Sequence, residues 1–376
     1  MKILLTGGGT GGHFYPIIAI AEELRDVAKE KKLLSPEIYY MAPTPYNARA
    51  LFENEIIFRK VTAGKQRRYF SLLNFFDLFK IATGVFQATW QIFFIMPDVI
   101  FGKGGYVSFP AMAAARFLGI PVVIHESDSH PGKVNLWAGK FAKRVALSYP
   151  EAAKYFKEDK VALTGNPVRK GITMAVKSGA FEYLNMEESI PVIFILGGSQ
   201  GSQRINESIL DALPELVEKY QIIHQTGSKN YQDMQKMADI ALEASPFKSR
   251  YKPFDYLNDL AMKMSAGAAS LVVSRSGSTI FEIASWGLPS ILIPIPESIS
   301  HDQTTNAFSY ARTGAADVIE ENNLTTEILL SEIEKILSNP ELQAKMAAAA
   351  KSFAKPDAAK KIAEQIIDIA LTHETT

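Results

Sequence analysis

Short apolar runs alternate with longer amphipathic stretches along the whole chain. Near the start, the apolar run Lys2–Thr6 is followed by glycines and by an amphipathic stretch from about Tyr15 to Lys29. The same order returns at Val192–Leu196, which precedes a second glycine-rich loop and a helical pattern that ends near Lys219. Apolar runs bounded by glycines are typical of buried strands, and the amphipathic stretches are typical of surface helices.

Further apolar runs predict more strands in both halves of the chain. They lie at residues 37–41, 98–101 and 122–125 in the first half, and at 222–224, 270–273 and 290–293 in the second. Regular alternation of strands and helices favours parallel sheets covered by helices on both faces. We therefore predict an α/β protein with two Rossmann-like, doubly wound domains, joined near Gly165–Arg169. Ligands of such sheets bind beyond the carboxyl ends of the strands, so we expect the active site in a cleft between the domains.

Composition narrows the classes of function. A length of 376 residues suits two domains, and a hydrophobic fraction of 47% supports two sizeable cores. Forty basic residues balance forty acidic ones, which argues against a general nucleic-acid binder. There is no cysteine, which excludes disulfides and thiolate zinc sites. Neither a signal peptide nor an unbroken apolar run of membrane-spanning length is evident, so we expect a cytoplasmic protein.

The first glycine loop allows two interpretations. Gly7, Gly9 and Gly12 match the spacing of a dinucleotide-binding loop, which holds a pyrophosphate at a helix N-terminus. That interpretation requires an acidic residue at the end of the second strand, and Tyr40–Thr44 has none, so an NAD-dependent dehydrogenase is disfavoured. Glycines could also serve only to permit a tight turn. His13 follows the loop and is either a general base or an ordinary helix-start residue.

A third loop, Ser274–Thr279, precedes a helix predicted to start near Ile280. Its last two residues, Ser278 and Thr279, can cap that helix, whose free N–H groups and dipole favour a diphosphate. Glu282 could accept hydrogen bonds from ribose hydroxyls, or could simply complement the dipole. Gln303 offers an amide suited to a sugar, or is a surface residue.

Seven segments, taken together, resemble the MurG family in sequence and in order. They are Gly8–His13, Gly104–Ser108, His125–Glu126, Gly165–Arg169, Gly197–Gly201, Ser274–Gly277 and Gln303–Asn306. Each segment alone is weak, but all seven in order, over a resemblance that runs from Met1 to about Phe353, are specific. The family consists of peripheral N-acetylglucosaminyltransferases with the GT-B fold, in which two Rossmann-like domains face each other across a cleft.

The resemblance implies a domain organisation and a reaction. It implies an acceptor and membrane-associating domain at 1–166, completed by a C-terminal helix within 355–376, and a UDP-GlcNAc-binding domain at 167–354. The implied reaction is an inverting transfer of GlcNAc from UDP-GlcNAc to the MurNAc 4-hydroxyl of undecaprenyl-pyrophosphoryl-MurNAc-pentapeptide (lipid I), giving lipid II for peptidoglycan.

Other activities stay open at this point. They are another GT-B enzyme with a different UDP-sugar and lipid acceptor, a UDP-GlcNAc epimerase, and a non-catalytic sugar-nucleotide-binding module. The sequence does not determine the oligomeric state.

The resemblance also implies site residues. For the donor these are Arg169 and Ser199 at the diphosphate and sugar, Ser278 and Thr279 at the helix start, Glu282 at the ribose, Leu257 at the uracil and Gln303 at the GlcNAc hydroxyls. For the acceptor they are Thr10, Gly11, Gly12, Tyr106 and Asp128, with His13 or Glu126 as the base. Asp128 stands where many members carry an amide, and it can accept but not donate hydrogen bonds when ionised. The stretch Arg275–Glu282 is one residue shorter than usual, which leaves the match at Ser278 and Thr279 open by one position.

No Asp-x-Asp motif occurs in the chain. Helix dipoles and Arg169 could stabilise the charge on the leaving UDP instead, so we predict no catalytic metal and no cofactor beyond the UDP-GlcNAc co-substrate.

The segment Leu72–Met96 is unusually aromatic. Its aromatic residues are Phe75, Phe76, Phe79, Phe86, Trp90, Phe93 and Phe94, and a basic cluster, Lys65–Arg68, precedes it. Asp77, Lys80, Gln87 and Gln91 interrupt it too often for a membrane-spanning helix. Apolar residues beside basic ones suit a surface that dips into anionic headgroups, so we expect peripheral contact with the inner face of the cell membrane. The alternative is that these aromatics form the core of the first domain.

Overall fold

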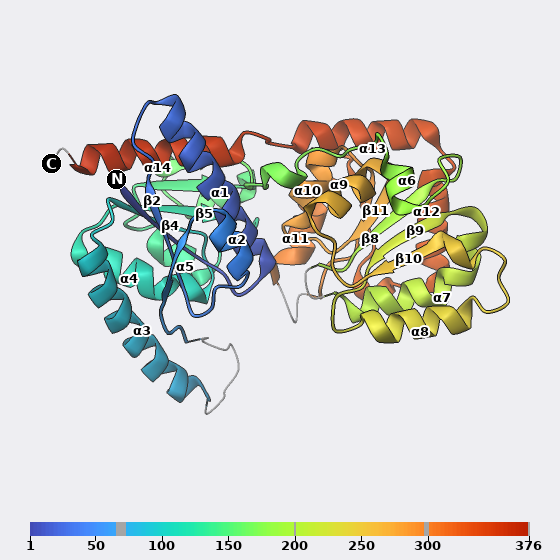
Figure 1. Ribbon diagram of the computed structural model, residues 1–376, viewed down its shortest axis with the longest axis horizontal. Coiled ribbons are helices and arrows are strands. Elements are labelled where there is room, and N and C mark those ends of the chain that lie inside the picture. Colours follow the sequence, from blue (N-terminus) through green and yellow to red (C-terminus); the bar gives the residue numbers. More distant parts are fainter. Residues whose placement is uncertain (65–72, 199–200, 297–300, 375–376) are drawn as a thin grey trace. The chain divides into compact units, whose positions relative to one another are not determined.

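The computed structural model describes residues 1–64, 73–198, 201–296 and 301–374 (Figure 1). The chain forms two compact units. Unit 1 consists of Met1–Arg169 and Lys355–Thr376, and unit 2 consists of Lys170–Ala354. The division falls three residues later than the sequence-based boundary after residue 166, so Arg169 belongs to unit 1.

Unit 1 is a parallel sheet covered by helices. Its strands are β1 (Lys2–Thr6), β2 (Glu37–Ala42), β3 (Ile57–Lys60), β4 (Val99–Gly102), β5 (Val122–Glu126), β6 (Arg144–Leu147) and β7 (Val161–Leu163). Its helices are α1 (Gly11–Glu30), α2 (Ala48–Glu53), α3 (Leu73–Ile95), α4 (Phe109–Leu118), α5 (Lys133–Ala138) and α14 (Ala358–Glu374), with a 3-10 turn η1 at Tyr106–Ser108. The strand order is β3-β2-β1-β4-β5-β6-β7, and all pairs are parallel.

The two faces of this sheet have separate cores. On one face, Ile3 and Leu5 of β1 pack with Ile17 of α1 and with Ile362 and Ile366 of the C-terminal helix α14. An ion pair between Lys360 and Glu30, at 2.8 Å, also joins α14 to α1.

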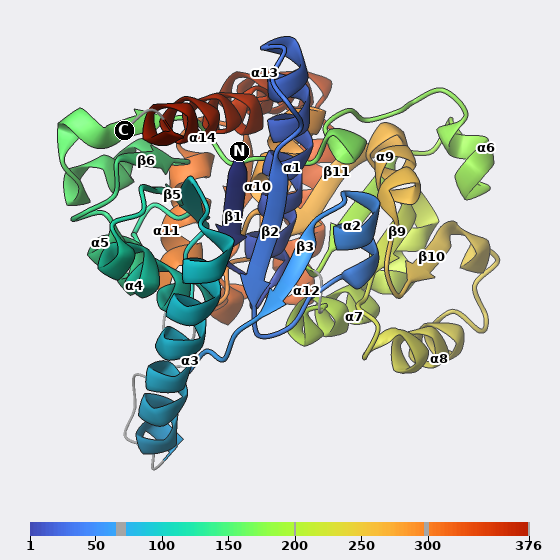
Figure 2. The same cartoon turned by 60° about the vertical axis from the view of Figure 1, so that its left-hand side comes forward.

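On the other face, Leu4 of β1 packs with Ile92 of α3 and Met112 of α4. Figure 2 shows α3 projecting beyond the sheet of unit 1.

Unit 2 repeats the plan with six parallel strands. They are β8 (Val192–Leu196), β9 (Gln221–Gln225), β10 (Tyr251–Phe254), β11 (Ala269–Ser274), β12 (Ser290–Leu292) and β13 (Ala316–Val318), in the order β10-β9-β8-β11-β12-β13. Its helices are α6 (Ala180–Leu184), α7 (Gln203–Lys219), α8 (Tyr231–Ala241), α9 (Asp259–Ala268), α10 (Thr279–Trp286), α11 (His301–Ala311), α12 (Thr326–Leu337) and α13 (Pro340–Phe353). Two doubly wound α/β units are therefore confirmed.

Each sheet reverses its direction of growth once. In unit 1 the reversal lies between β1 and β4, and in unit 2 it lies between β8 and β11. Loops that leave the carboxyl ends of such neighbouring strands diverge, which makes room for a ligand. The glycine loops read from the sequence leave these strands, so the fold places them where doubly wound sheets bind ligands.

One element boundary differs from the prediction. The first helix begins at Gly11 and not at Tyr15, with Pro16 inside it. The sequence pattern favours a start just before Pro16, because proline fits the first turn of a helix. The structure adds one earlier turn, whose first backbone bonds run from the N–H groups of His13 and Phe14 to the carbonyl of Thr10.

Candidate active site

The first glycine loop lies against two neighbouring segments of unit 1. The Tyr40 hydroxyl donates a 2.6 Å hydrogen bond to the carbonyl of Gly7. A Cβ atom on Gly8 would lie only 2.7 Å from that hydroxyl, so a side chain has no room there. On the outer side, the ring of Tyr106 comes close to Gly9, since a Cβ atom on Gly9 would lie 3.5 Å from its Cε1. Tyr40 therefore contacts the loop at Gly7 and Gly8, and Tyr106 contacts it at Gly9.

His13 stands in the first turn of α1. Its Nδ1 lies 3.2 Å from the hydroxyl of Thr10. Thr10 is the N-cap residue of α1, and its side chain makes no hydrogen bond to the helix N-terminus. When Nδ1–H donates to that hydroxyl, Nε2 keeps its lone pair. Burial, and secondarily the charge of Lys103, lower the pKa of His13 to about 4. The imidazole is therefore neutral at physiological pH.

Glu126 ends β5, two strands from β1, and is fixed by three donors. The backbone N–H of Asp128 donates to Oε1 at 3.0 Å, while Gly132 N–H and the Asn135 amide donate to Oε2 at 3.0 and 2.9 Å. Burial, and then the charge of Asp128, raise the pKa of Glu126 to about 7. A carboxyl group with a pKa near neutrality suits proton transfer, but three of its roughly four acceptor positions already receive hydrogen bonds.

Lys103 follows β4 and packs against the first glycine loop, since a Cβ on Gly7 would lie 2.7 Å from the Lys103 Cβ. The residue is 1% exposed, and its ammonium has no hydrogen-bond partner among the described residues. Burial lowers the pKa of Lys103 to about 8, although Glu126 and Asp128 attract its charge. The sequence analysis did not single out this residue, because a lone lysine after a strand is usually a surface residue.

His125, next to Glu126, has a structural role. Its Nε2 lies 3.0 Å from the carbonyl of Gly165 and 3.3 Å from the Ser148 hydroxyl. Burial lowers the pKa of His125 well below its usual value, so the ring is neutral. It ties β5 to the segment that leads out of unit 1. At the end of that segment, the Arg169 guanidinium stacks on Tyr15 of α1, 3.9 Å from the ring centroid.

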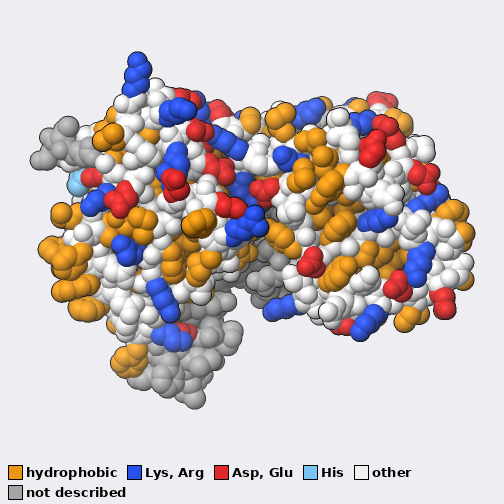
Figure 3. Space-filling model, in the orientation of Figure 1, with side chains coloured by type: hydrophobic (Ala, Val, Ile, Leu, Met, Phe, Trp, Pro, Cys, Tyr) orange, Lys and Arg blue, Asp and Glu red, His pale blue; other side chains and the backbone are white. Residues whose placement is uncertain are grey.

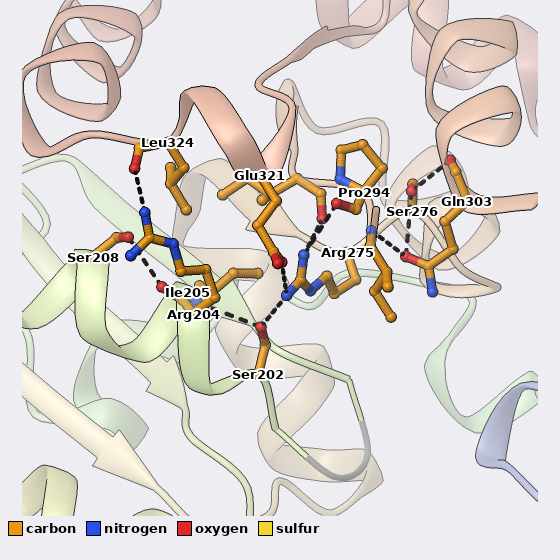
Figure 4. A network of polar contacts seen from close by, with 12 residues as sticks. Ser202, Arg204, Ile205, Ser208, Arg275, Ser276, Pro294, Gln303, Glu321 and Leu324 are labelled. Atoms are coloured by element: carbon orange, nitrogen blue, oxygen red, sulfur yellow. Dashed lines mark hydrogen bonds and ion pairs between the residues drawn. The ribbon is translucent and has the colours of Figure 1, made fainter. Parts of the chain in front are cut away.

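In unit 2, a partly buried arginine organises the loops at the β8–β11 reversal (Figure 4). Arg275, just after β11, donates to the carbonyls of Ile293 and Pro294 at 3.0 and 3.2 Å. It also donates to the Ser202 hydroxyl at 2.7 Å and pairs with Glu321 at 2.5 Å. Ser202 in turn caps α7, which follows the second glycine loop. A single side chain thus fixes three loops at this edge.

Gln303 of α11 belongs to the same edge (Figure 4). The side-chain Oε1 of Gln303 accepts from the N–H of Ile295 at 3.3 Å. The Ser276 hydroxyl donates to the backbone carbonyl of Gln303 at 2.8 Å. Gly277 lies beside its Nε2, since a Cβ there would be 3.9 Å away. The Gln303 amide N–H groups therefore lie by the β11–α10 loop.

At the start of α10, the N–H groups of Ile280 and Phe281 donate to the carbonyls of Gly277 and Ser278 at 3.2 and 3.1 Å. Ser278 is the N-cap residue, its side chain makes no cap bond, and Thr279 is the first helical residue. Glu282 lies in the first turn and is partly exposed. Leu257, between β10 and α9, is buried, and its N–H is donated to Gln225 at 3.0 Å.

The predicted residues thus fall into two groups. Unit 1 brings Thr10, Gly11, Gly12, His13, Tyr106, Glu126 and Asp128 together at the β1–β4–β5 edge, and it also holds Arg169. Unit 2 brings Leu257, Ser278, Thr279, Glu282 and Gln303 together at its own edge. Ser199 lies outside the described residues. Among the described residues, no group of three or more acidic or histidine side chains is arranged to hold a metal ion.

Comparison with known proteins decides the family. Residues 3–147 match the glycosyltransferase family 28 N-terminal domain, and residues 192–362 match the family 28 C-terminal domain. Two relatives are named UDP-N-acetylglucosamine–N-acetylmuramyl-(pentapeptide) pyrophosphoryl-undecaprenol N-acetylglucosamine transferase. The one from Clostridium novyi is 37% identical over 339 residues, covering 89% of this chain and 90% of the relative. The one from Treponema denticola is 35% identical, covering 87% and 86%.

A solved structure agrees. MurG of Acinetobacter baumannii superposes with a TM-score of 0.72 at 26% identity, covering 98% of this chain and 99% of that one. The chain belongs to the MurG family. A UDP-GlcNAc 2-epimerase from Neisseria meningitidis has a TM-score of 0.68 at 16% identity, a likeness of fold alone.

For this MurG-family chain, the structure adds residues that the sequence analysis missed. These residues are Lys103, which packs against the first glycine loop, Asn135, which bonds to Glu126, and Gln225, which bonds to Leu257. A further one is Arg275, which bonds to Ser202 at the start of α7. Asn135 had no signal in the sequence, because its bond to Glu126 depends on how α5 returns to the sheet. Arg275 lay inside a recognised motif, but only the fold shows that it reaches Ser202.

Proposed function

We propose that this MurG-family glycosyltransferase transfers GlcNAc from UDP-GlcNAc to the MurNAc 4-hydroxyl of lipid I, with inversion, to give lipid II. The observation that carries the proposal is the pairing of family membership with two sets of polar groups, each at the reversal point of its own sheet. Unit 2 would bind the donor, and unit 1 would bind the acceptor and supply the base.

In unit 2, the N-terminus of α10 would hold the UDP diphosphate through the helix dipole and the Ser278 and Thr279 hydroxyls. Glu282, in the first turn, would accept from the ribose hydroxyls. Gln303 would donate its amide N–H groups to GlcNAc. The carbonyl of Leu257 would read the uracil, since its N–H is already donated to Gln225. By family resemblance, Ser199 would also contact the diphosphate.

In unit 1, His13 is the better-placed base. With Nδ1–H directed to Thr10, its Nε2 lone pair can accept the proton of the acceptor hydroxyl. The hydroxyl oxygen then bonds to C1 of GlcNAc from the face opposite UDP, the C1–O bond to the diphosphate breaks, and UDP leaves with the electron pair. Inversion follows from this single displacement. Glu126, which already accepts three hydrogen bonds, would orient Asp128 and the acceptor loop, and Tyr106 would position the acceptor.

Charge develops on the leaving UDP as this bond breaks. The dipole of α10 favours negative charge at that point, and Arg169 would add a positive charge. The proposed chemistry therefore uses no metal ion, which transfer in the presence of EDTA tests.

Helix α3 would attach the protein to the membrane that carries lipid I. Its side chains Phe79, Phe86, Trp90, Phe93 and Phe94 are exposed. Hydrophobic side chains gather on the flank of unit 1 that carries α3 and α4 (Figure 3). A lipid-linked acceptor needs an enzyme at the bilayer surface, and aromatics on one helix suit insertion into the headgroup region. The basic cluster Lys65–Arg68 and the side chains of Phe75 and Phe76 lie outside the described residues.

By length and composition alone, Asp77–Ile95 is apolar enough to cross a membrane, with a mean hydropathy of 1.3. Its contacts favour a peripheral helix. The Gln87 side chain accepts from the N–H of Thr62 at 2.9 Å, and the Gln91 amide donates to the carbonyl of Lys60 at 2.8 Å. Ala88 and Ile92 are fully buried in unit 1. One face of α3 is thus fixed to the sheet, which supports a protein at the inner membrane face and not across it.

The test is a transfer assay with labelled UDP-GlcNAc and a short-chain lipid I analogue in EDTA, comparing wild type with His13→Ala. We expect labelled disaccharide from the wild type, and a loss of kcat of at least about 100-fold in the variant, as is typical for a general base. His373→Ala, a histidine in the last turn of α14, is the matched control and should keep full activity.

Three outcomes would contradict parts of the proposal. No disaccharide from the wild type, despite UDP binding, would reject lipid I as acceptor. Conversion of UDP-GlcNAc to UDP-ManNAc without acceptor would identify an epimerase. Full activity of His13→Ala with loss in Glu126→Gln would move the base to Glu126.

A further inference from the structure

The donor half of the site contains a buried glutamine to which neither the sequence motifs nor the proposed chemistry gives a role. Gln225 is the last residue of β9, and it is 3% exposed. Its strand lies between β8, which leads into the glycine loop Gly197–Gly201, and β10, which leads toward Leu257. Gln225 therefore sits between the second glycine loop and the loop that carries Leu257.

The side chain bonds to both loops at once. Its Oε1 accepts from the N–H of Leu257 at 3.0 Å, and its Nε2 donates to the carbonyl of Gly198 at 3.3 Å. Both partners are backbone groups, so the glutamine fixes main-chain positions and not side chains. Gly198 has a φ of +84°, so this part of the loop depends on glycine.

The next residue strengthens the same junction. The carbonyl of Thr226 accepts from the Asn206 amide of α7 at 3.0 Å and from the Asn230 amide at 3.0 Å. The loop packs directly against this carbonyl, since a Cβ on Gly201 would lie 2.1 Å from it. The end of β9 thus sets the position of the glycine loop, the start of α7 and the β10–α9 connection.

We propose that Gln225 is a positioning residue that couples recognition of the donor's base at Leu257 to the backbone of the second glycine loop at Gly198. The inference rests on the proposed function, because it assumes a UDP-sugar in unit 2. A buried amide that accepts from one backbone group and donates to another holds both in one arrangement, because leaving either backbone group unpaired costs free energy.

The chemistry gives Gln225 a role in base selectivity. With its N–H bound to Gln225, Leu257 presents its carbonyl to the base. A carbonyl accepts from N3–H of uracil, whereas N3 of cytosine carries no hydrogen. Loss of the Gln225 bond frees the Leu257 N–H, which lets the loop turn and weakens the preference for uracil over cytosine.

Two variants separate the two bonds. Gln225→Met removes both at nearly the same volume. Gln225→Glu keeps an acceptor for Leu257 but loses the donor to Gly198. The matched control is Gln221→Met at the other end of β9, a buried glutamine that also bonds to backbone groups, at Glu187 and Ile190, far from the carboxyl edge.

The measurements are the KM values for UDP-GlcNAc and acceptor, and the inhibition constants of UDP and CDP. For Gln225→Met we expect a UDP-GlcNAc KM about tenfold higher or more, an unchanged acceptor KM, and a ratio of CDP to UDP inhibition constants that falls by about fivefold or more, as two lost bonds would give. For Gln225→Glu we expect weaker UDP binding with the ratio retained. Gln221→Met should lower the Tm without changing the donor KM or the ratio.

Equal donor KM values and ratios in Gln225→Met and Gln221→Met would overturn the proposal, since Gln225 would then contribute to folding alone. If the ratio of CDP to UDP inhibition constants also fell in Gln225→Glu, the separate roles given to the bonds at Leu257 and Gly198 would be overturned. Wild-type protein that binds neither UDP nor UDP-GlcNAc would reject the proposed function itself, which the wild-type control reports before any variant is compared.

Discussion

Replacing Lys103 with methionine should stabilise the protein. The ammonium is buried at 1% exposure with no hydrogen-bond partner among the described residues, and methionine fills similar space without a charge. An unpaired buried charge destabilises a fold, and apolar replacements of buried charges are often stabilising. The expected gain is therefore opposite in sign to that of most core substitutions.

The magnitude follows from the lysine's own titration. Burial lowers its pKa from 10.5 to about 8, a shift that corresponds to about 3 kcal/mol. Because the folded-state pKa lies below the unfolded one, this penalty is fully present below about pH 8 and disappears as the pH rises toward 10.5. Removing the ammonium also removes its attraction for Glu126, so we expect a net gain of about 1–3 kcal/mol at neutral pH.

The assay is denaturant unfolding followed by tryptophan fluorescence, at about pH 7 and about pH 10. Trp90 and Trp137 report on unit 1. Lys140→Met, at an exposed lysine after α5, is the control and should change stability by less than about 0.5 kcal/mol. The reasoning is refuted if Lys103→Met is less stable than wild type at pH 7, or if its advantage does not shrink at pH 10.

Four further predictions follow from the same geometry. With His13 as the base, kcat/KM should stay constant down to about pH 5, because burial lowers the pKa of His13 to about 4. A fall in kcat/KM below about pH 7 that disappears in Glu126→Gln would instead assign the base to Glu126, because burial raises the pKa of Glu126 to about 7. Asn135→Ala should lose about 2–4 kcal/mol of unfolding free energy, because its amide donates to both the Glu126 carboxylate and the His125 carbonyl; Asn54→Ala, which loses one neutral bond, should lose about 1 kcal/mol, and equal losses would show that the Glu126 bond contributes nothing. Arg275→Ala should raise the KM for UDP-GlcNAc at least about tenfold with little change for the acceptor, and Arg275→Lys should not restore it, because lysine cannot make the forked contacts; equal changes in both KM values would argue against a local role. Serine at Phe86, Trp90 and Phe94 together should weaken binding to phosphatidylglycerol vesicles in a sedimentation assay, while Phe52→Ser, at an exposed residue of α2, should not; unchanged binding of the triple variant would place the membrane contact elsewhere.

The sequence by itself determined the two-unit α/β fold and the position of its loops. Strands β1 and β8 are continuous apolar runs followed by glycines, and this signal is local, so both were predicted with the observed bounds. The end of α7 at Lys219 was likewise fixed by local periodicity. Short edge strands such as β7, Val161–Leu163, were missed, because three residues, two of them exposed, carry too little pattern.

Tertiary structure decided which side chains meet. Tyr40 reaches Gly7, Gln225 reaches Leu257, and Arg275 reaches Ser202 across 33, 32 and 73 positions. No local pattern encodes such pairs, because they depend on which strands become neighbours. The same holds for charge, since Lys103 looks like a surface lysine in sequence and becomes a buried ammonium only when β4 and the first glycine loop pack together. The motifs predicted where ligands bind, whereas packing decided which side chains are buried and which hydrogen bonds form around the predicted site.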